Sequence, residues 1–304
     1  MYHYVRDLGR SRYPNIKGRD IKDFCGQLEH LARKYTLVTA EQVVAAVKGG
    51  TELPPKACWL TFDDGYLDHW LVVFPLLHER GWQGTFFPPA QAIREGTLLD
   101  VNRIHFIIAS QPDPATIIEA IRRFVSDRSG QDEIETFEHY WHAYAEESSL
   151  DSTEIVFIKQ MLQFGLPDAP RKELANDLFR DYVSIDPAAF AAELYMSMDQ
   201  LRTMIRCGMY VGNHGNEHLW LDTLDPADQQ HEIDQSLAFL KELGAPTSEW
   251  VMCYPYGAYD KSLLDILSSS GCMIGVTTKC AIADLSRGSA LELPRLDTND
   301  LPVD

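Results

Sequence analysis

Residues 57–65 read ACWLTFDDG. The first six of them, residues 57–62, form a mostly apolar run, which predicts a buried β-strand. The run ends in Asp63, Asp64 and Gly65, and turn chemistry alone would also explain this group. Because successive side chains of a strand point in opposite directions, the two carboxylates should face different surroundings. One of them can then bind a metal ion while the other stays available as a base.

Helical and strand patterns alternate on both sides of this run. Strands are expected at 84–87, 209–212, 250–253 and 273–277. Helices are expected after the cap residue Asp20, from Thr39 to before Gly49, over 67–80, from Ser197 to Gly208, from Asp225 to near Gly244, and before Gly271. Such repeated units predict an α/β fold with a mainly parallel sheet and helices outside it. Ligand sites in these folds lie at the carboxyl ends of the strands.

The middle of the chain has a different pattern. Strand-like runs are missing between residues 100 and 197, and helical patterns cover 115–126, 136–147, 154–164 and 172–182. We therefore expect a single domain over residues 1–304 that contains a large helical insertion at 100–197. Insertions of this length usually have a function. This one could cover the mouth of the barrel and select the substrate, or it could form a contact between subunits.

Composition narrows the classes of function. The chain has 45 acidic and 27 basic residues and a formal net charge of −18, which argues against binding to nucleic acids or anionic membranes. It contains no apolar stretch long enough to span a membrane. Its six cysteines are scattered without CxxC pairs, which indicates thiols in a reducing compartment. No apolar signal sequence is visible at residues 1–10, so a cytoplasmic location is expected.

Two further polar groups follow strand-like runs. Residues 214–218 read HGNEH, and residues 253–257 read CYPYG. His214 and His218 would reach one point if this segment formed a helical turn, although a loop with incidental histidines is the simpler alternative. Together with Asp64 they make a set of two histidines and one carboxylate, which leaves coordination positions open for water and substrate. A competing pair, His139 and His142, lies in an acidic helical stretch and is expected on a solvated face.

The order TFDDG at 61–65, HGNEH at 214–218 and CYPYG at 253–257 resembles the polysaccharide deacetylase family, also called the NodB-homology domain or carbohydrate esterase family 4. The resemblance covers most of residues 1–100 and 200–304. It implies a distorted (β/α)7 TIM-like barrel and removal of an N-acetyl group from an amino sugar. It also implies that Asp64, His214 and His218 hold a metal, usually Zn²⁺, although this ligand set also fits other divalent first-row metals. Asp63 would be the base, and the backbone N–H of Tyr256 would stabilise the oxyanion.

Two positions depart from the family pattern. The family's arginine that orients the base is replaced by Cys253, and Arg295 is our candidate to substitute for it, although an ordinary structural ion pair is an equal alternative. The family's late histidine, its general acid, is missing because no histidine follows His231. Of His3, His69 and His105, we favour His3 and His105 as the acid, because each lies at an expected strand end or at the boundary of the insertion. A hydrogen-bonded structural role is the alternative for each of them.

These features predict a cytoplasmic N-deacetylase of surface-polysaccharide or lipopolysaccharide biosynthesis. Its substrate would be an N-acetylated carbohydrate, namely a sugar nucleotide, a lipid-linked sugar or a polysaccharide, with the smaller substrates favoured. One alternative is hydrolysis of another amide, such as a formamide or a cyclic amide. The other alternative is a barrel that binds a glycan without cleaving it. Such a binding protein would not need Asp63, a carboxylate that is not a metal ligand.

Overall fold

The computed structural model describes residues 1–130, 133–148 and 151–303. The chain divides into two compact units. The first, here called the barrel unit, comprises Met1–Asp7, Gly18–Thr97 and Ala191–Asp304. The second, the helical unit, comprises Leu98–Phe190 together with Leu8–Lys17. A segment near the start of the chain therefore belongs to the same unit as its middle, which no pattern in the sequence indicated.

The barrel unit holds all the strands of the described residues. They are β1 (Val5–Arg6), β2 (Arg19–Asp20), β3 (Thr36–Leu37), β4 (Ala57–Cys58), β5 (Thr61–Asp63), β6 (Thr85–Phe87), β7 (Tyr210–Val211), β8 (Trp250–Cys253) and β9 (Cys272–Val276). Within the described residues, seven segments pair in parallel in the order Tyr2, β5, β6, β7, β8, β9 and Leu293, where Tyr2 and Leu293 each form a single bridge. The amino group of Met1 donates to the carbonyl oxygen of Leu296 at 2.6 Å and joins the last segment to the first. The expected parallel sheet is thus present, closed into a barrel.

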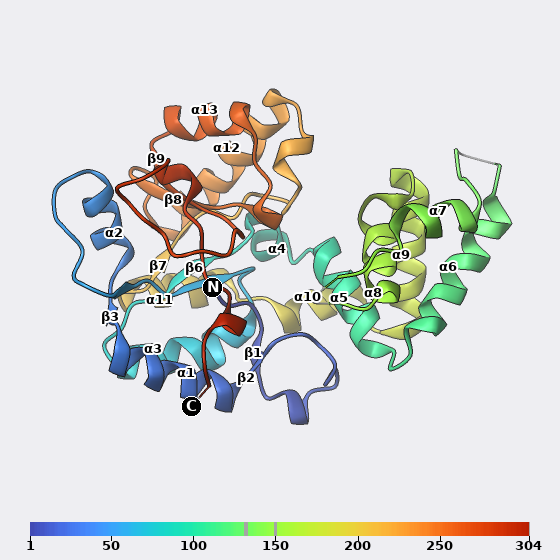
Figure 1. Cartoon of the computed structure of the whole chain (residues 1–304), viewed down its shortest axis with the longest axis horizontal. Helices are drawn as coiled ribbons and strands as arrows, with labels where there is room; N and C mark the ends of the chain where they lie inside the picture. The colour runs from blue at the N-terminus through green and yellow to red at the C-terminus, as the bar shows by residue number, and fades with distance from the viewer. Residues whose placement is uncertain (131–132, 149–150, 304) are drawn as a thin grey trace. The chain divides into compact units, whose positions relative to one another are not determined.

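Helices surround these strands (Figure 1). They are α1 (Ile21–Lys34), α2 (Ala40–Val47), α3 (Phe74–Glu79), α4 (Ala90–Glu95), α11 (Met198–Arg206), α12 (Pro226–Leu243) and α13 (Lys261–Ser269). Several begin and end where side-chain chemistry predicted. Asp20 caps α1, and Ser197 forms a capping box with Gln200 at α11. Asp225 caps α12, which ends at the left-handed Gly244.

One expectation about local structure was wrong, and a second held except for a local change of winding. The apolar run 57–62 is not one strand, because β4 pairs with β3 while β5 pairs with β6. The helix expected over 67–80 is present, but its residues His69–Val73 form a π-helical turn that leads into α3. The split of the run 57–62 reflects pairing with two different strands, which hydrophobic periodicity does not record.

Aromatic rings from neighbouring strands pack between the barrel and α1, whose Phe24 meets Tyr2 and Phe62 edge to face. Phe62 of β5 stacks on Phe86 of β6 at 5.0 Å between ring centroids and on Tyr2 at 5.3 Å. All three side chains are buried. Gly212 follows β7, and a Cβ there would lie 2.4 Å from the Phe87 ring, so only glycine fits this position. Dense packing of this kind holds the ends of β5 and β7, where the polar residues lie, in fixed positions.

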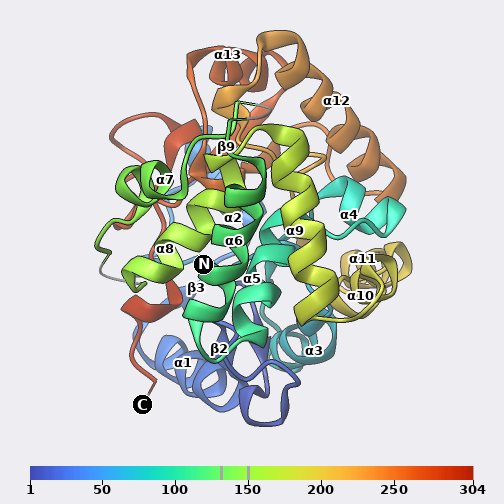
Figure 2. The same ribbon diagram turned by 90° about the vertical axis from the view of Figure 1, so that its right-hand side faces the viewer.

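The helical unit contains α5 (Asp100–Ser110), α6 (Pro114–Arg128), α7 (Phe137–Tyr144), α8 (Thr153–Gln160) and α9 (Asp168–Tyr182). These helices pack side by side (Figure 2). α10 (Pro187–Leu194) crosses the boundary between the two units. Phe106 of α5 and Phe190 of α10 meet edge to face at 4.7 Å, and Tyr13 packs against both rings. This contact explains why Leu8–Lys17 belongs to the unit.

The described residues include no helix with the length and apolar character needed to cross a lipid bilayer. All six cysteines are free thiols, as their spacing indicated. Cys280 is exposed, whereas Cys253 and Cys272 are buried.

Candidate metal centre

Three side chains from two loops of the barrel unit converge on one point. Nε2 of His214 lies 3.2 Å from Oδ1 of Asp64, and Nε2 of His218 lies 3.3 Å from the same oxygen. All three side chains are buried. The set that the sequence singled out is therefore assembled by the fold. The competing pair, His139 and His142, lies on α7 with both side chains exposed.

Backbone conformation, and not a helix, brings the two histidines together. The helical turn expected over 214–218 does not form. Instead, Gly215 and His218 adopt positive φ angles of 69° and 59°, which bend the loop back on itself. Asp64 also has a positive φ, of 71°, and its N–H donates to the carbonyl oxygen of Phe87 at 3.0 Å. Strained conformations of this type persist where the surrounding structure holds them, often at functional sites.

The donor set fits a divalent first-row metal. Donor atoms about 2.0–2.2 Å from a tetrahedral ion lie about 3.3–3.6 Å from one another, which agrees with the two contacts to Asp64. Nδ1 of His214 lies 2.7 Å from the carbonyl oxygen of Cys253, which leaves Nε2 to face Asp64. This second contact orients the ring in the way that metal-binding histidines require. Burial lowers the pKa of His218, whereas at His214 the contributions of Cys253 and Asp64 outweigh burial and raise the pKa.

Asp63 faces a different environment from Asp64. Arg295 donates from Nη1 to Oδ1 of Asp63 at 2.9 Å and from Nη2 to Oδ2 at 2.8 Å. Both side chains are buried. Burial by itself raises the pKa of the Asp63 carboxyl, but the charges of Arg295 and His3 and the Arg295 hydrogen bonds outweigh it and hold that pKa well below its usual range. Asp63 is therefore ionised, and each oxygen keeps a lone pair for a further proton.

Arg295 also contacts the residue that replaces the family's arginine. Its Nη2 lies 3.3 Å from Sγ of Cys253, and its Nε donates to the carbonyl oxygen of Thr277 at 3.0 Å. A guanidinium from the segment after the last barrel strand thus lies against both Cys253 and Asp63. Because 232 residues separate Arg295 from Asp63 in the sequence, no local sequence pattern predicts this contact.

The candidate acids occupy three different environments. Nε2 of His3 lies 3.8 Å from Oδ2 of Asp63, and the His3 side chain is 41% exposed. His69 is fully buried, with Nε2 2.8 Å from the carbonyl oxygen of His3. Burial lowers the pKa of His69 to about 4. His3 is thus placed beside the candidate base, while His69 lies beneath the His3 backbone.

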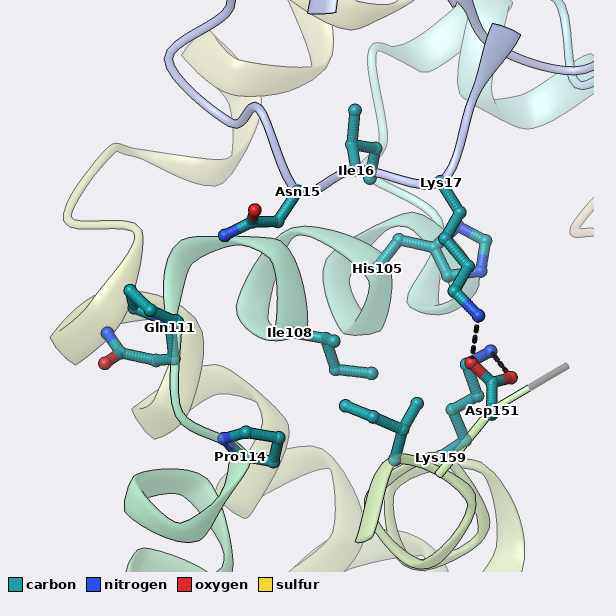
Figure 3. A pocket seen from close by; sticks show the side chains of 11 residues that line it. Asn15, Ile16, Lys17, His105, Ile108, Gln111, Pro114, Asp151 and Lys159 are labelled. Atoms are coloured by element: carbon teal, nitrogen blue, oxygen red, sulfur yellow. Dashed lines mark hydrogen bonds and ion pairs between the residues drawn. The ribbon is translucent and has the colours of Figure 1, made fainter. Parts of the chain in front are cut away.

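His105 lies on α5 in the helical unit. It lines a cavity of about 320 Å³ whose other walls include Asn15, Ile108, Gln111 and Ile155. Asp151 also lines this cavity and forms ion pairs with Lys17 and Lys159 (Figure 3). His105 therefore belongs to a cavity formed within the helical unit.

Tyr256 lies in a 3-10 turn, Pro255–Gly257, directly after β8. Its φ of 57° is left-handed, and its ring packs edge to face against His218 at 4.7 Å. A Cβ at the next residue, Gly257, would lie 2.2 Å from Oγ1 of Thr278. The turn therefore packs closely against Thr278, in the segment after β9, and places Tyr256 beside one of the candidate metal ligands.

Two buried side chains that sequence reasoning missed support the site. The Tyr66 hydroxyl donates to Oδ2 of Asp64 at 2.5 Å. Oε2 of Glu232, on α12, accepts from the N–H groups of Asn216 at 2.9 Å and Glu217 at 3.1 Å. Tyr66 could have been found from its place directly after the DDG group. Glu232 had no such signal beyond being an acidic residue on a helix.

Comparison with known proteins agrees with this geometry. A sequence model of the family described as "Polysaccharide deacetylase" matches residues 50–127 and 183–274. The poly-beta-1,6-N-acetyl-D-glucosamine N-deacetylase of Escherichia coli K12 is 43% identical over 88 residues. That match covers 29% of this chain and only 13% of the E. coli protein.

Solved structures share the fold over almost the whole chain. The deacetylase PplD of Streptococcus pyogenes, in complex with acetate, superposes with a TM-score of 0.60 at 19% identity and covers 97% of this chain and 89% of its own. A de-N-acetylase from Aggregatibacter actinomycetemcomitans superposes with a TM-score of 0.57 at 15% identity and covers 98% and 93%. At such low identity these likenesses show the fold alone. The family model, by contrast, matches more than half of the residues, and this chain belongs to the polysaccharide deacetylase family.

Proposed function

We propose that this chain is a metal-dependent hydrolase that removes N-acetyl groups from an amino-sugar polymer. The observation that carries the proposal is the placement of an ionised Asp63 next to the buried donor set of Asp64, His214 and His218. A binding module has no use for a carboxylate held ionised beside a metal site. The name of the E. coli relative supports an N-acetylglucosamine polysaccharide as the substrate, in place of the smaller sugar nucleotide or lipid-linked sugar that the sequence alone favours.

The proposed mechanism assigns one task to each residue. Asp64, His214 and His218 would hold a divalent ion, with zinc as the expected metal, which supplies a Lewis acid for the amide carbonyl and makes a water easier to deprotonate. Asp63 takes the proton of the attacking water, and Arg295 keeps the Asp63 carboxylate ionised and oriented. The backbone N–H of Tyr256 would donate to the developing oxyanion.

The leaving amine needs a proton in the transition state. We propose that His3 supplies it, because its Nε2 lies 3.8 Å from Asp63 and its side chain is partly exposed, so it can exchange protons with solvent. His105 remains the alternative donor that the sequence suggested. Its surroundings belong to the helical unit, where it lines the cavity described above.

Acetate release tests the proposal. The zinc-loaded protein should release acetate from a β-1,6-linked N-acetylglucosamine oligomer, and a chelator should abolish the release. His214→Ala should lose both bound zinc and activity, whereas Glu217→Gln, an exposed position in the same loop, should keep both. Asp63→Asn should keep zinc but lose activity by several orders of magnitude.

Other outcomes would select the alternatives. Hydrolysis by Asp63→Asn at near the wild-type rate, with a normal melting temperature, would show that Asp63 is not the base. Binding of the oligomer without acetate release would favour a non-catalytic glycan-binding barrel. Release of formate or ring opening of a cyclic amide, but no acetate, would favour a different amide substrate.

A further inference from the structure

The helical unit contains a cavity that the proposed reaction does not use. It has a volume of about 320 Å³ and is lined by residues of α5, of α8 and of the segment 15–17 (Figure 3). All of these segments belong to the helical unit, so the cavity is formed within one compact unit. At about 30 Å³ for a group the size of a water molecule, it holds roughly ten such groups. This volume suits a small organic ligand.

The cavity walls are largely apolar. Ile16, Ile108 of α5 and Ile155 of α8 line it together with Pro112 and Pro114. Ile108 and Ile155 are only half-buried, so part of their apolar surface is still uncovered. A sugar among these walls would leave most of its hydroxyl groups without hydrogen-bond partners, which is costly. An alkyl chain instead covers the walls, and each methylene that it buries strengthens binding by about fourfold.

One side of the cavity carries charge, because Lys17 and Lys159 both point toward Asp151 (Figure 3). Nζ of Lys159 donates to Oδ2 of Asp151 at 2.7 Å, and Lys17 forms an ion pair with the other carboxylate oxygen. Burial raises the pKa of Asp151, but the hydrogen bonds and charges of the two lysines outweigh it and lower that pKa. Two ammonium groups and one carboxylate give this cluster a net charge of +1, in a chain whose formal net charge is −18.

We propose that this cavity binds a small amphipathic anion. An unbranched alkyl chain of about eight to ten carbons would lie between Ile16, Ile108 and Ile155. Its anionic end, a carboxylate or a phosphate, would lie against Lys159 and Lys17. An ammonium has three N–H groups, so Lys159 can donate to a second anionic oxygen beside Asp151. Such a ligand is neither the substrate nor the product of the proposed reaction.

Calorimetric titration of the full chain tests the site. Octanoate should bind with a dissociation constant of about 1 mM or below, and hexanoate should bind about tenfold more weakly because two methylenes are missing. Acetate, which has no alkyl chain to bury, should show no measurable binding. Octanol lacks the charge and should bind about tenfold more weakly than octanoate. A negative heat-capacity change would mark the burial of apolar surface. Octyl phosphate, compared with octanoate, shows which anionic group the site prefers.

Variants test the charged side and the apolar walls separately. Lys159→Gln should weaken octanoate binding by about tenfold but change octanol binding by about twofold or less. Ile108→Trp narrows the cavity and should weaken the binding of both ligands by about tenfold or more. Two matched controls in the helical unit should bind as wild type does. Lys172→Gln removes an exposed lysine that pairs with Asp168, and Phe164→Trp enlarges an exposed apolar side chain.

Several outcomes would overturn the proposal. No binding of octanoate or octyl phosphate by folded wild type would do so. An equal loss of octanoate and octanol binding in Lys159→Gln would show that the lysine does not recognise the charge. An equal loss in Phe164→Trp would place the ligand on another surface. Melting temperatures show whether each variant folds, and Lys17→Gln provides a second reading if Lys159→Gln does not. Acetate release is measured separately, so failure of the proposed function would leave these results unchanged.

Discussion

Arg295 and Asp63 form a buried, bidentate ion pair although 232 residues separate them. The two parallel hydrogen bonds use the planar fork of the guanidinium, which lysine cannot reproduce. The pair joins the segment after the last barrel strand to the end of β5. It therefore contributes both to closure of the barrel and to the charge state of the proposed base.

Arg295→Ala should change both the stability and the pH profile. The variant leaves a buried carboxylate without its partner, so the free energy of unfolding should fall by about 3–5 kcal/mol. Arg295 lowers the pKa of Asp63, so its removal raises that pKa, and the acid limb of kcat/KM should move to higher pH. Arg94→Ala, which removes an exposed ion pair with Glu242, should cost about 1 kcal/mol or less. An unmoved acid limb would mean that Arg295 does not tune the base.

Tyr66→Phe should weaken metal binding while the fold persists. The hydroxyl donates to Oδ2 of Asp64 at 2.5 Å and fixes the carboxylate so that Oδ1 faces the histidines. Loss of such a supporting contact typically costs about 10–100-fold in metal affinity. The phenyl ring can still stack on Tyr4, whose ring lies 4.0 Å away between centroids. Zinc affinity is measured by competition with a chelator, and an unchanged affinity would contradict the assigned role.

Glu232→Leu and Glu232→Gln should differ sharply. Leucine leaves the buried N–H group of Asn216 and the partly buried N–H group of Glu217 without their acceptor, which should cost about 2–5 kcal/mol of unfolding free energy. Glutamine retains one acceptor oxygen and should cost about 1 kcal/mol. Urea unfolding measures both values. Equal costs for the two variants would show that the loop does not depend on these hydrogen bonds.

His3→Gln and His105→Gln separate the two candidate acids. If His3 protonates the leaving amine, His3→Gln should lower kcat by about 10²–10⁴-fold, with zinc content unchanged. His105→Gln should then change kcat by about twofold or less. A large loss of kcat in His105→Gln, with little change in His3→Gln, would instead identify His105 as the residue that protonates the leaving amine. Steady-state kinetics with the acetylated oligomer decide between them.

His69 should make the protein sensitive to acid. Its folded-state pKa is about 4, below the ordinary value near 6.5, because the ring is buried. Between these pH values the unfolded chain binds the proton more tightly, so unfolding free energy falls as pH falls, by up to about 3 kcal/mol. His69→Gln should flatten this dependence in urea titrations at pH 4–6.5. Exposed His139 is the control, and an equal effect of His139→Gln would rule out burial as the cause.

The sequence by itself determined the elements whose signals are local. Capping residues such as Asp20, Ser197 and Asp225 marked helix ends correctly, because their side chains bond to backbone groups within three residues. The convergence of Asp64, His214 and His218 was also predictable from the sequence, because the chemistry of these side chains and their places after strands point to one edge of a parallel sheet.

Only the tertiary structure decided what depends on segments far apart in the chain. The left-handed loop that brings His214 and His218 together replaces the expected helical turn. Glu232 beneath that loop, and Leu8–Lys17 within the helical unit, gave no local signal. Arg295 was a candidate from sequence, but its bidentate contact with Asp63 requires the barrel to close first. Long-range packing sets these positions, and a pattern read along the chain records only neighbours.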